Sequence, residues 1–459
     1  MLYTLAASLA LLIGPLPQGA RRATPPTMSN SESLNFLNPD QCRDIKAKVG
    51  TPCFVYDEAT LKRQATTALS FPNAYGLTVR FAMKASPNAA ILKTFDTLGL
   101  HIDASSGFEV RRAVAAGISA EKMSLSSQET PHDLGELLDL GIKFNACSLK
   151  QLEAFGKLRK GDRSDQLGVR FNPGLGSGGT GKTNVGGPAS SFGIWHELMP
   201  EVKAILAKYD LEPARVHTHI GSGSDPAVWQ RTSGMSLDLV KQLPTVKILN
   251  LGGGYKVGRM STETSTDLGV IGAPVRELFE SFAKDDGREL KLEIEPGTFL
   301  VANSASLLTT VQDVVSTGGG GFDFLKLDSG MTELLRPSLY GSQHPAVLVP
   351  HTAGAARAAD GRKYVAVGHC CESGDLVTPE PDEAETLGPR ALGGEAQDGD
   401  LLVIEGAGAY CSSMCTKNYN SFPEAPEVLV DEEGKPHVIR KRQDLAQIYQ
   451  NEVRPDGLW

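Results

Sequence analysis

The sequence predicts an α/β fold, a TIM-like (β/α)8 barrel followed by a C-terminal, mostly β domain. From Arg80 onward, eight short β-rich runs alternate with segments whose apolar residues recur every three or four positions, the period of an amphipathic helix. After about Ala305 the β-rich runs continue, but long helical segments become rare. A doubly wound open sheet also alternates strands and helices, so counting alone leaves it as an alternative.

The expected barrel strands are RFAMK (80–84), HIDAS (101–105), KMSLS (122–126), KFNAC (143–147), LGVRF (167–171), RVHTHI (215–220), KILNL (247–251) and KLEIE (291–295). Several helices between them end at a glycine, Gly99, Gly117 or Gly141, as a left-handed C-terminal cap requires. DEEGK, between PEVLV and HVIRKR, predicts a hairpin turn. We expect a leader at 1–35, a segment contributing to the β domain at 36–60, the barrel at 61–305 and the C-terminal β domain at 306–459.

The composition excludes several classes of protein. With 459 residues, of which 41% are hydrophobic and 22% charged, the chain can bury a large core. Its 45 basic and 54 acidic residues give a net charge of -9, which provides no basic surface for nucleic acid or an anionic membrane. The seven cysteines form no C-x-x-C pair and their number is odd, which favours a reducing compartment. No cysteine or histidine cluster has zinc-site spacing, so we expect no metal.

One apolar segment, residues 2–13, precedes the predicted fold. Its twelve residues are too few to span a bilayer as a helix. The segment could be the apolar part of a targeting signal, although no Lys or Arg precedes it. We therefore expect a targeting leader or an upstream extension here, and a soluble, intracellular protein.

Polar residues end most of the expected barrel strands, where the active site of a TIM barrel lies. They are Lys84, Asp103, Ser105, Arg170, Asn172, His219, Ser222, Gly252, Gly253, Gly254 and Glu295. The glycines, in LGGGYK, offer unobstructed N–H groups for a phosphate, although an ordinary glycine-rich turn has the same composition. We expect these residues to converge on one mouth of the barrel.

Lys84 and Glu295 each allow two interpretations. Lys84 could extend from a strand end into solvent, the commoner fate of a lysine, or form a Schiff base with a carbonyl cofactor if burial lowers its pKa. Glu295 could hold a proton on a pyridine nitrogen. Glu293 lies two residues earlier on the same strand face, so one of the two glutamates could be an inward barrel residue paired with a base.

A phosphate-loop pattern, GSGGTGKT at 176–183, makes a nucleotide hydrolase a rival hypothesis. In such enzymes the loop opens directly into a helix. Here NVGGPASS follows, with two glycines and a proline, so we interpret the match, which includes Lys182, as chance.

Nine blocks in one order resemble a known family. FAMKASPN, VRFNPGLG with KTNVGG and FGIW, HTHIGSG, LNLGGGY, LEIEPG, LRPSLYGSQH, CESGD, GAGAY and YNSFP are similar to segments of the group III pyridoxal-phosphate decarboxylases, which have an alanine-racemase-like barrel. Within that family they most resemble the diaminopimelate decarboxylases, from about Thr51 to about Gln443. The resemblance implies decarboxylation of meso-2,6-diaminopimelate to L-lysine with pyridoxal 5'-phosphate, the last step of lysine biosynthesis.

The resemblance also implies roles for single residues. Lys84 would carry the cofactor, His219 would stack on its ring and Glu295 would hold its pyridine nitrogen. The remaining cofactor-binding positions would be Asp103, Arg170, Ser222, Gly252, Gly253, Gly254, Gly297 and Tyr410. Arg336 and Tyr340, with Tyr410, would bind the substrate. Cys371 as a catalytic acid, with Glu372 and Ser373 as substrate contacts, would reach the partner's site in a homodimer.

Two departures from the family pattern leave the substrate open. The family usually has Arg after E-P-G, but this chain has Thr298, and Ser191 replaces a common lysine. A decarboxylase of ornithine, arginine or D-lysine is therefore an alternative, and a catalytically inactive homologue that binds a partner protein is a third hypothesis. Because lysine synthesis in photosynthetic eukaryotes is plastid-based, the leader suggests a plastid, with the cytoplasm as the alternative.

Overall fold

The structure is a computed structural model that describes residues 32–175, 186–219, 221, 223, 225–355 and 361–457. Eight parallel strands form a closed barrel in the order β5-β4-β3-β2-β10-β9-β8-β6, and β5 pairs with β6 to complete the ring. These strands are β2 (Leu77–Ala82), β3 (His101–Ala104), β4 (Met123–Leu125), β5 (Lys143–Ala146), β6 (Leu167–Asn172), β8 (Arg215–His217), β9 (Ile248–Asn250) and β10 (Lys291–Ile294). The predicted barrel is confirmed and the open sheet is excluded.

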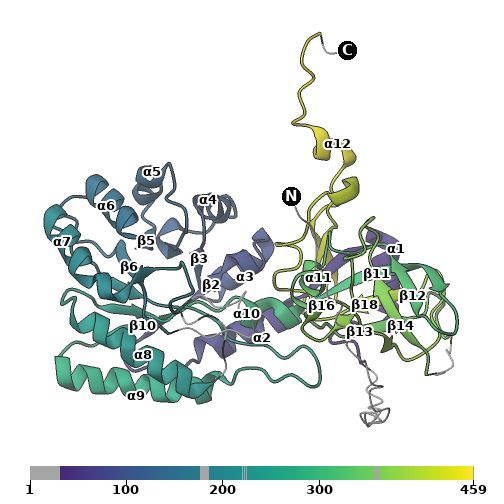
Figure 1. Ribbon diagram of the computed structural model, residues 1–459, viewed down its shortest axis with the longest axis horizontal. Helices are drawn as coiled ribbons and strands as arrows, with labels where there is room; N and C mark the ends of the chain where they lie inside the picture. Colours follow the sequence, from purple (N-terminus) through teal and green to yellow (C-terminus); the bar gives the residue numbers. More distant parts are fainter. Residues whose placement is uncertain are drawn as a thin grey trace, which may run out of the picture. The chain divides into compact units, whose positions relative to one another are not determined.

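Helices follow the barrel strands and surround them (Figure 1). They are α3 (Ala89–Thr97), α4 (Gly107–Ala115), α5 (Leu134–Asp139), α6 (Leu149–Leu158), α7 (Met199–Tyr209), α8 (Pro226–Lys241), α9 (Leu268–Asp286) and the short α10 (Thr298–Val301), with α2 (Glu58–Leu69) before the first strand. The sequence explains where several of these helices begin and end. Ser106 accepts a hydrogen bond from the Glu109 N–H at the start of α4, and Gly99, Gly117 and Gly141 have the predicted positive φ.

Successive side chains along each barrel strand point alternately outward, toward the helices, and inward, into the barrel. On β2, Phe81 points outward and packs edge-to-face on Phe95 of α3, with ring centroids 4.7 Å apart. The neighbouring Arg80 points inward, where its guanidinium pairs with Glu293 at 2.8 Å. Arg215 pairs with the other oxygen of Glu293, also at 2.8 Å. The sequence alone left open which of Glu293 and Glu295 is an inward barrel residue paired with a base. The structure shows that it is Glu293, which braces the barrel interior below the mouth.

The second sheet is mostly antiparallel and contains the predicted C-terminal runs. Its described strands are β1 (Cys53–Asp57), β11 (Ala305–Ser316), β12 (Asp323–Leu327), β13 (Ala346–Val349), β14 (Lys363–Val367), β17 (Arg390–Ala391), β18 (Leu401–Ile404), β19 (Glu427–Val430) and β20 (Pro436–Arg440). β1 pairs with β11 and β19, so the chain begins in this sheet, leaves it to build the barrel and returns at β11. β19 and β20 form the predicted hairpin across Asp431 and Gly434.

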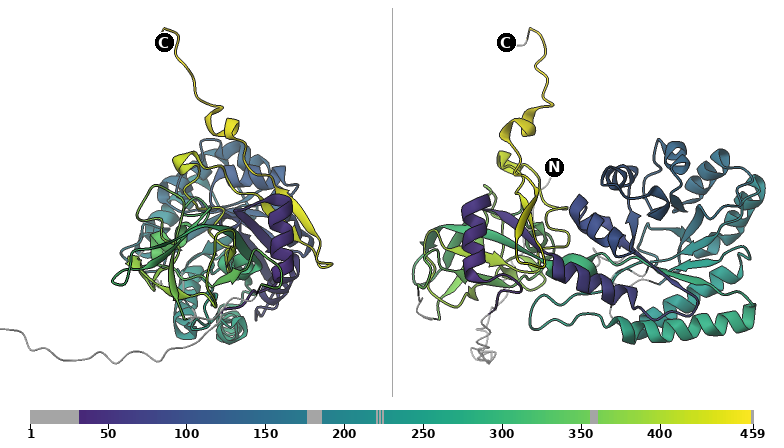
Figure 2. Two further views of the ribbon diagram at one scale, coloured as in Figure 1. Left: turned by 90° about the vertical axis from the view of Figure 1, so that its right-hand side faces the viewer. Right: turned by 180° about the vertical axis from the view of Figure 1, so that it is seen from behind.

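Most of the remaining elements belong to this second part of the fold. They are α1 (Pro39–Val49), α11 (Leu335–Tyr340), α12 (Leu445–Tyr449) and the ribbon of β15 (Pro379–Glu380) and β16 (Glu383–Leu387). The two-residue β7 (Ile194–Trp195) pairs with β6 in the barrel sheet instead. Cys42 and Ile45 of α1 pack on Val55, Leu308 and Val403 of the sheet, and the purple α1 lies beside the green and yellow strands in Figure 2. Within the described residues, no helix is both long and apolar enough to cross a membrane.

Candidate active site

A cavity of about 800 Å³ opens at the carboxyl ends of the barrel strands. Its lining includes eleven of the sequence-predicted residues: Lys84, Asp103, Ser105, Arg170, His219, Gly254, Glu295, Gly297, Arg336, Tyr340 and Tyr410. This volume is in the range of small-molecule sites in proteins. The structure therefore brings Lys84 and Glu295 together in one cavity.

Lys84, expected to end the first strand, lies two residues beyond the end of β2 on a 3-10 turn, Met83–Ala85. The carbonyl of Ala85 in the same turn accepts hydrogen bonds from the Tyr410 N–H at 2.9 Å and from the Ser413 hydroxyl at 3.1 Å. Two residues far along the chain thus fix the lysine's turn. Burial lowers the pKa of Lys84, as the Schiff-base interpretation assumed, but the nearby acidic groups of Tyr410, Asp103 and Glu295 outweigh burial, so the net shift of the pKa is upward.

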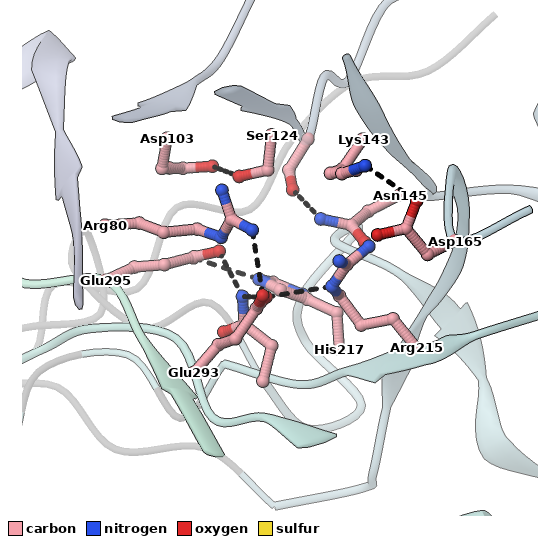
Figure 3. Close-up of polar contacts among 12 residues, drawn as sticks. Arg80, Asp103, Ser124, Lys143, Asn145, Asp165, Arg215, His217, Glu293 and Glu295 are labelled. Carbon is pink, nitrogen blue, oxygen red and sulfur yellow. Dashed lines mark hydrogen bonds and ion pairs between the residues drawn. The ribbon is translucent and has the colours of Figure 1, made fainter. Parts of the chain in front are cut away.

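Glu295 is held in place by two side chains of neighbouring strands. Its Oε2 lies 2.9 Å from His217 Nε2 (Figure 3). Its Oε1 accepts a hydrogen bond from Asn250 Nδ2 at 2.7 Å. Burial raises the pKa of Glu295, but His217 and then His219 and Arg170 lower it further than burial raises it. Burial lowers the pKa of His217, so this ring is neutral and its Nε2–H donates to the carboxylate.

The pKa of Asp103, on β3, is shifted in the opposite direction. Desolvation and the nearby Glu295 charge raise the pKa of Asp103 well above its usual range, and its Oδ1 lies 3.2 Å from the Ser124 hydroxyl (Figure 3). The pKa values of two buried carboxyl groups in one cavity are thus shifted apart, downward for Glu295 and upward for Asp103.

His219 lies two residues beyond the end of β8, and its ring packs against the glycine loop. The Gly221 N–H donates to His219 Nδ1 at 2.9 Å. A Cβ on Gly252 would come within 2.8 Å of the ring, so only glycine fits there. Burial, followed by the charges of Arg170 and Lys84, lowers the pKa of His219 well below its usual range. The ring is neutral and open to stacking.

The glycine loop offers fewer free donors than the sequence suggests. The Gly252 N–H already donates to Asn250 Oδ1 at 2.8 Å, so the expectation that all three amides face a phosphate is wrong at this position. The N–H groups of Gly253 and Gly254 have no acceptor among the described residues. A Cβ on Gly253 would lie 2.2 Å from the Glu295 carbonyl oxygen. Ser222, the other expected phosphate contact, and Lys182 of the rival phosphate-loop pattern lie outside the described residues.

Several predicted residues lie away from the cavity. Asn172 bonds to the N–H groups of Gly174 and Gly187 at 3.1 and 2.9 Å, and so braces a loop. Cys371 is exposed, and its N–H donates to Asn420 Oδ1 at 2.8 Å. Glu372 and Ser373 line a separate hollow of about 820 Å³ with Phe422 and His369 of the same chain. One chain alone therefore does not bring CESGD to Lys84.

Sequence reasoning missed several residues of the cavity region, among them two with a clear role in the site. His217 holds Glu295, and alternation from His219 along the same strand could have found it, since residues two apart face the same side. Arg259, on the loop after β9, lines the cavity, and no sequence pattern singled it out. Thr298 and Arg336 lie on the lining with it.

Comparisons with known proteins agree with this geometry. Residues 59–302 match the family model described as pyridoxal-dependent decarboxylase, pyridoxal binding domain. A diaminopimelate decarboxylase of Escherichia coli K12 is 34% identical over 429 residues, 90% of this chain and 96% of that protein. This chain belongs to the diaminopimelate decarboxylase family. It is therefore a pyridoxal-phosphate-dependent carboxy-lyase.

Solved structures of the family have the same fold. A crystal structure of a diaminopimelate decarboxylase matches with a TM-score of 0.82 at 32% identity, covering 92% of this chain and 98% of that one. The diaminopimelate decarboxylase of Helicobacter pylori complexed with L-lysine matches with a TM-score of 0.75 at 26% identity, covering 89% and 98%. The predicted decarboxylase family, fold and cofactor are confirmed.

The residues of the cavity fit pyridoxal phosphate. Lys84 offers an amine, ionised Glu295 offers an acceptor for a protonated ring nitrogen, and the neutral His219 ring offers a flat apolar face. The amides of Gly253 and Gly254 are donors suited to a phosphate. The donor set thus matches the chemistry of an aldehyde, a pyridine and a phosphate in one molecule.

Proposed function

We propose that this enzyme decarboxylates meso-2,6-diaminopimelate, releasing carbon dioxide and L-lysine. The observation that carries the proposal is the meeting of Lys84, His219 and Glu295 in one cavity with Arg336 and Tyr340 on its lining. The names of the relatives support the substrate, as does the L-lysine bound by the Helicobacter pylori enzyme.

Bound pyridoxal phosphate supplies a carbonyl that combines with amines and a pyridine ring that accepts the electron pair left by departing carbon dioxide. Lys84 would hold the cofactor through its amine, after losing the proton that Asp103, Tyr410 and Glu295 stabilise. Glu295 would keep a proton on the ring nitrogen. A unit charge pair about 4 Å apart at an effective dielectric of about 20 is worth about 4 kcal/mol before desolvation.

Other residues would position the two ligands. His219 would stack on the cofactor ring, and Gly253, Gly254, Ser222 and Tyr410 would hold the phosphate. Asp103, Arg170, Gly252 and Gly297 would complete the cofactor site. Arg336 would bind a substrate carboxylate beside Tyr340, whose ring centroid lies 5.6 Å from the guanidinium carbon.

Substrate profiling tests the proposal, because Thr298 is the observation that favours another basic amino acid. We expect carbon dioxide release from meso-2,6-diaminopimelate with kcat/KM at least about a hundred-fold above that for ornithine, arginine or D-lysine, since a site built for two charged ends loses about 1.5–3 kcal/mol for each contact left unmade. A preference for a substrate with one carboxylate would contradict it. No release from any of the four would support the inactive homologue instead.

We also propose that the enzyme is a homodimer with shared sites. Cys371 is exposed, and Glu372 and Ser373 line a hollow apart from Lys84 in the same chain, which supports a place for all three in the partner's site. There Cys371 would return a proton to the reacting carbon, and Glu372 would bind the second ammonium group. The leader at 1–35 and its plastid destination rest on residues that lie almost wholly outside the described chain, and they stay predictions.

Mixed dimers test the shared site. Lys84→Ala and Cys371→Ala chains, each inactive alone, are expected to regain about a quarter of the wild-type rate after mixing and reassociation, because about half of the dimers are then mixed and each has one intact site. The measurement is carbon dioxide release before and after mixing. If the mixture stays inactive although mass spectrometry detects mixed dimers, both residues serve the same chain's site.

A further inference from the structure

Arg259 is a cavity residue to which the proposed mechanism gives no task. It lies on the loop between β9 and α9, and it lines the same cavity as Thr298, Arg336 and Tyr340. Thr298 begins α10 at the position where the family pattern has arginine. The lining thus lacks the arginine that the family pattern has at position 298 and contains an unexpected arginine at position 259.

Neither Arg259 nor Arg336 forms an ion pair with a carboxylate among the described residues. Arg259 Nε donates to the Gly406 carbonyl at 3.0 Å, but its buried Nη2 has no partner. Arg336 Nη2 donates to the Ser342 hydroxyl at 3.3 Å, but its buried Nε has no partner. Glu263, the carboxylate on the Arg259 loop, accepts from the backbone N–H of Arg259 at 2.7 Å, and no ion pair joins it to the guanidinium. Buried donors left unpaired are costly unless a ligand satisfies them.

The Arg259 side chain is held in place before any ligand binds. A Cβ on Gly406 would lie 2.9 Å from Arg259 Cγ, so the arginine stem packs directly on the glycine backbone. Asn303 Nδ2 donates to the Gly258 carbonyl at 3.0 Å, and the Thr266 hydroxyl accepts from the Lys256 N–H at 2.9 Å. The loop is fixed at both sides of Arg259, which reduces the entropy lost on binding.

Two like charges lie near each other in this part of the cavity. Burial, followed by the positive charge of Arg336, lowers the pKa of Arg259 to about 10. The guanidinium stays protonated near neutral pH, and an anion between the two arginines would relieve both burial and repulsion. The planar fork of a guanidinium matches a carboxylate in shape and charge.

We infer that Arg259 and Arg336 together bind the carboxylate that the substrate keeps, with Arg259 supplying the positive charge absent at Thr298. The inference rests on the proposed function, in which the substrate has a carboxylate at each end and the product retains one. Arg259 is then a specificity-determining residue that contacts the unreactive end of the substrate.

Binding to the holoenzyme tests this assignment with two ligands that differ in one group. L-Lysine carries the retained carboxylate, and cadaverine is the same molecule without it. Arg259→Ala is expected to raise the Kd of L-lysine by about ten- to a hundred-fold and to leave that of cadaverine within about two-fold. Arg276→Ala, an exposed arginine on α9 whose ion pair with Glu280 is 3.6 Å long, is the matched control and should change neither.

Second-site rescue makes the test independent of folding. Thr298→Arg in the Arg259→Ala protein is expected to recover most of the L-lysine affinity and of the KM for meso-2,6-diaminopimelate. Arg259→Lys keeps the charge and is expected to lose less than Arg259→Ala. If Arg259→Ala proves unstable, the ratio of the L-lysine Kd to the cadaverine Kd is measured on Arg259→Lys and on the rescued protein instead. That ratio then decides whether Arg259 binds the carboxylate.

The outcomes separate this inference from the proposed function. An unchanged ratio of L-lysine to cadaverine affinity in Arg259→Ala would overturn the assignment of Arg259, even if the wild type decarboxylates diaminopimelate. Weaker binding of pyridoxal phosphate with an unchanged ratio would also overturn it, because Arg259 would then serve the cofactor's phosphate. If the wild type prefers ornithine, the proposed function fails, and the ligand pair still reports on the carboxylate subsite.

Discussion

Lys84→Ala is expected to lower carbon dioxide release from diaminopimelate by about 10^4-fold or more, because the amine that holds the cofactor is the nucleophile of the site. The visible absorbance of the bound cofactor should also be lost on desalting, since only contacts such as those of His219 and Glu295 would remain. Lys157→Ala, on the exposed face of α6, should keep both activity and absorbance. A Lys84→Ala protein that keeps the cofactor covalently bound would contradict the assignment.

Glu295→Gln is expected to lower kcat by about a thousand-fold, which corresponds to the loss of about 4 kcal/mol of charge stabilisation at the ring nitrogen. The glutamine oxygen can still accept the hydrogen bond from His217, whereas the one from Asn250 Nδ2 is lost, so the fold should lose little stability. The measurements are kcat at saturating substrate and the thermal midpoint of unfolding. Glu280→Gln, on the exposed face of α9, is the control.

Two results would contradict this role of Glu295. If Glu295→Gln keeps more than about half of the wild-type kcat, the carboxylate charge is not needed at the ring. If the loss of activity only follows a loss of folded protein, Glu295 braces the barrel mouth, as Glu293 braces the layer below with Arg80 and Arg215. The thermal midpoint separates these cases from the predicted one.

Most of the fold could be predicted from local patterns. Strand alternation and helix periodicity are properties of short segments, and the glycine caps at Gly99, Gly117 and Gly141 depend only on the backbone around them. The residues at the barrel mouth could be predicted from the positions of the strand ends alone. The sequence predicts that residues 36–60 contribute to the β domain, but local patterns could not show that β1 lies between β11 and β19, because each pairing joins residues some 250 positions or more apart.

The electrostatics of the site depended on such distant contacts. The pKa of Lys84 is raised because Tyr410, Asp103 and Glu295 surround it, and no window around Lys84 contains these groups. The Gly252 N–H donates to the side chain of Asn250, two residues earlier. This contact depends on the rotamer of Asn250 and on the geometry of the turn, which the sequence does not specify. Arg259 packs on Gly406 and faces the charge of Arg336, which leaves its Nη2 without a hydrogen-bond partner among the described residues. Residue types could be predicted, whereas their charges and free donors required the folded chain.

The central claim is that the amine of Lys84 bonds to pyridoxal phosphate in the cavity that also contains Glu295. Reduction of the holoenzyme with borohydride, followed by proteolysis and mass spectrometry, tests it most directly. We expect one pyridoxyl-phosphate group per chain, on the peptide that contains FAMKASPN and on Lys84 itself. A label on any other lysine, or a holoenzyme whose cofactor cannot be fixed by reduction, would contradict it.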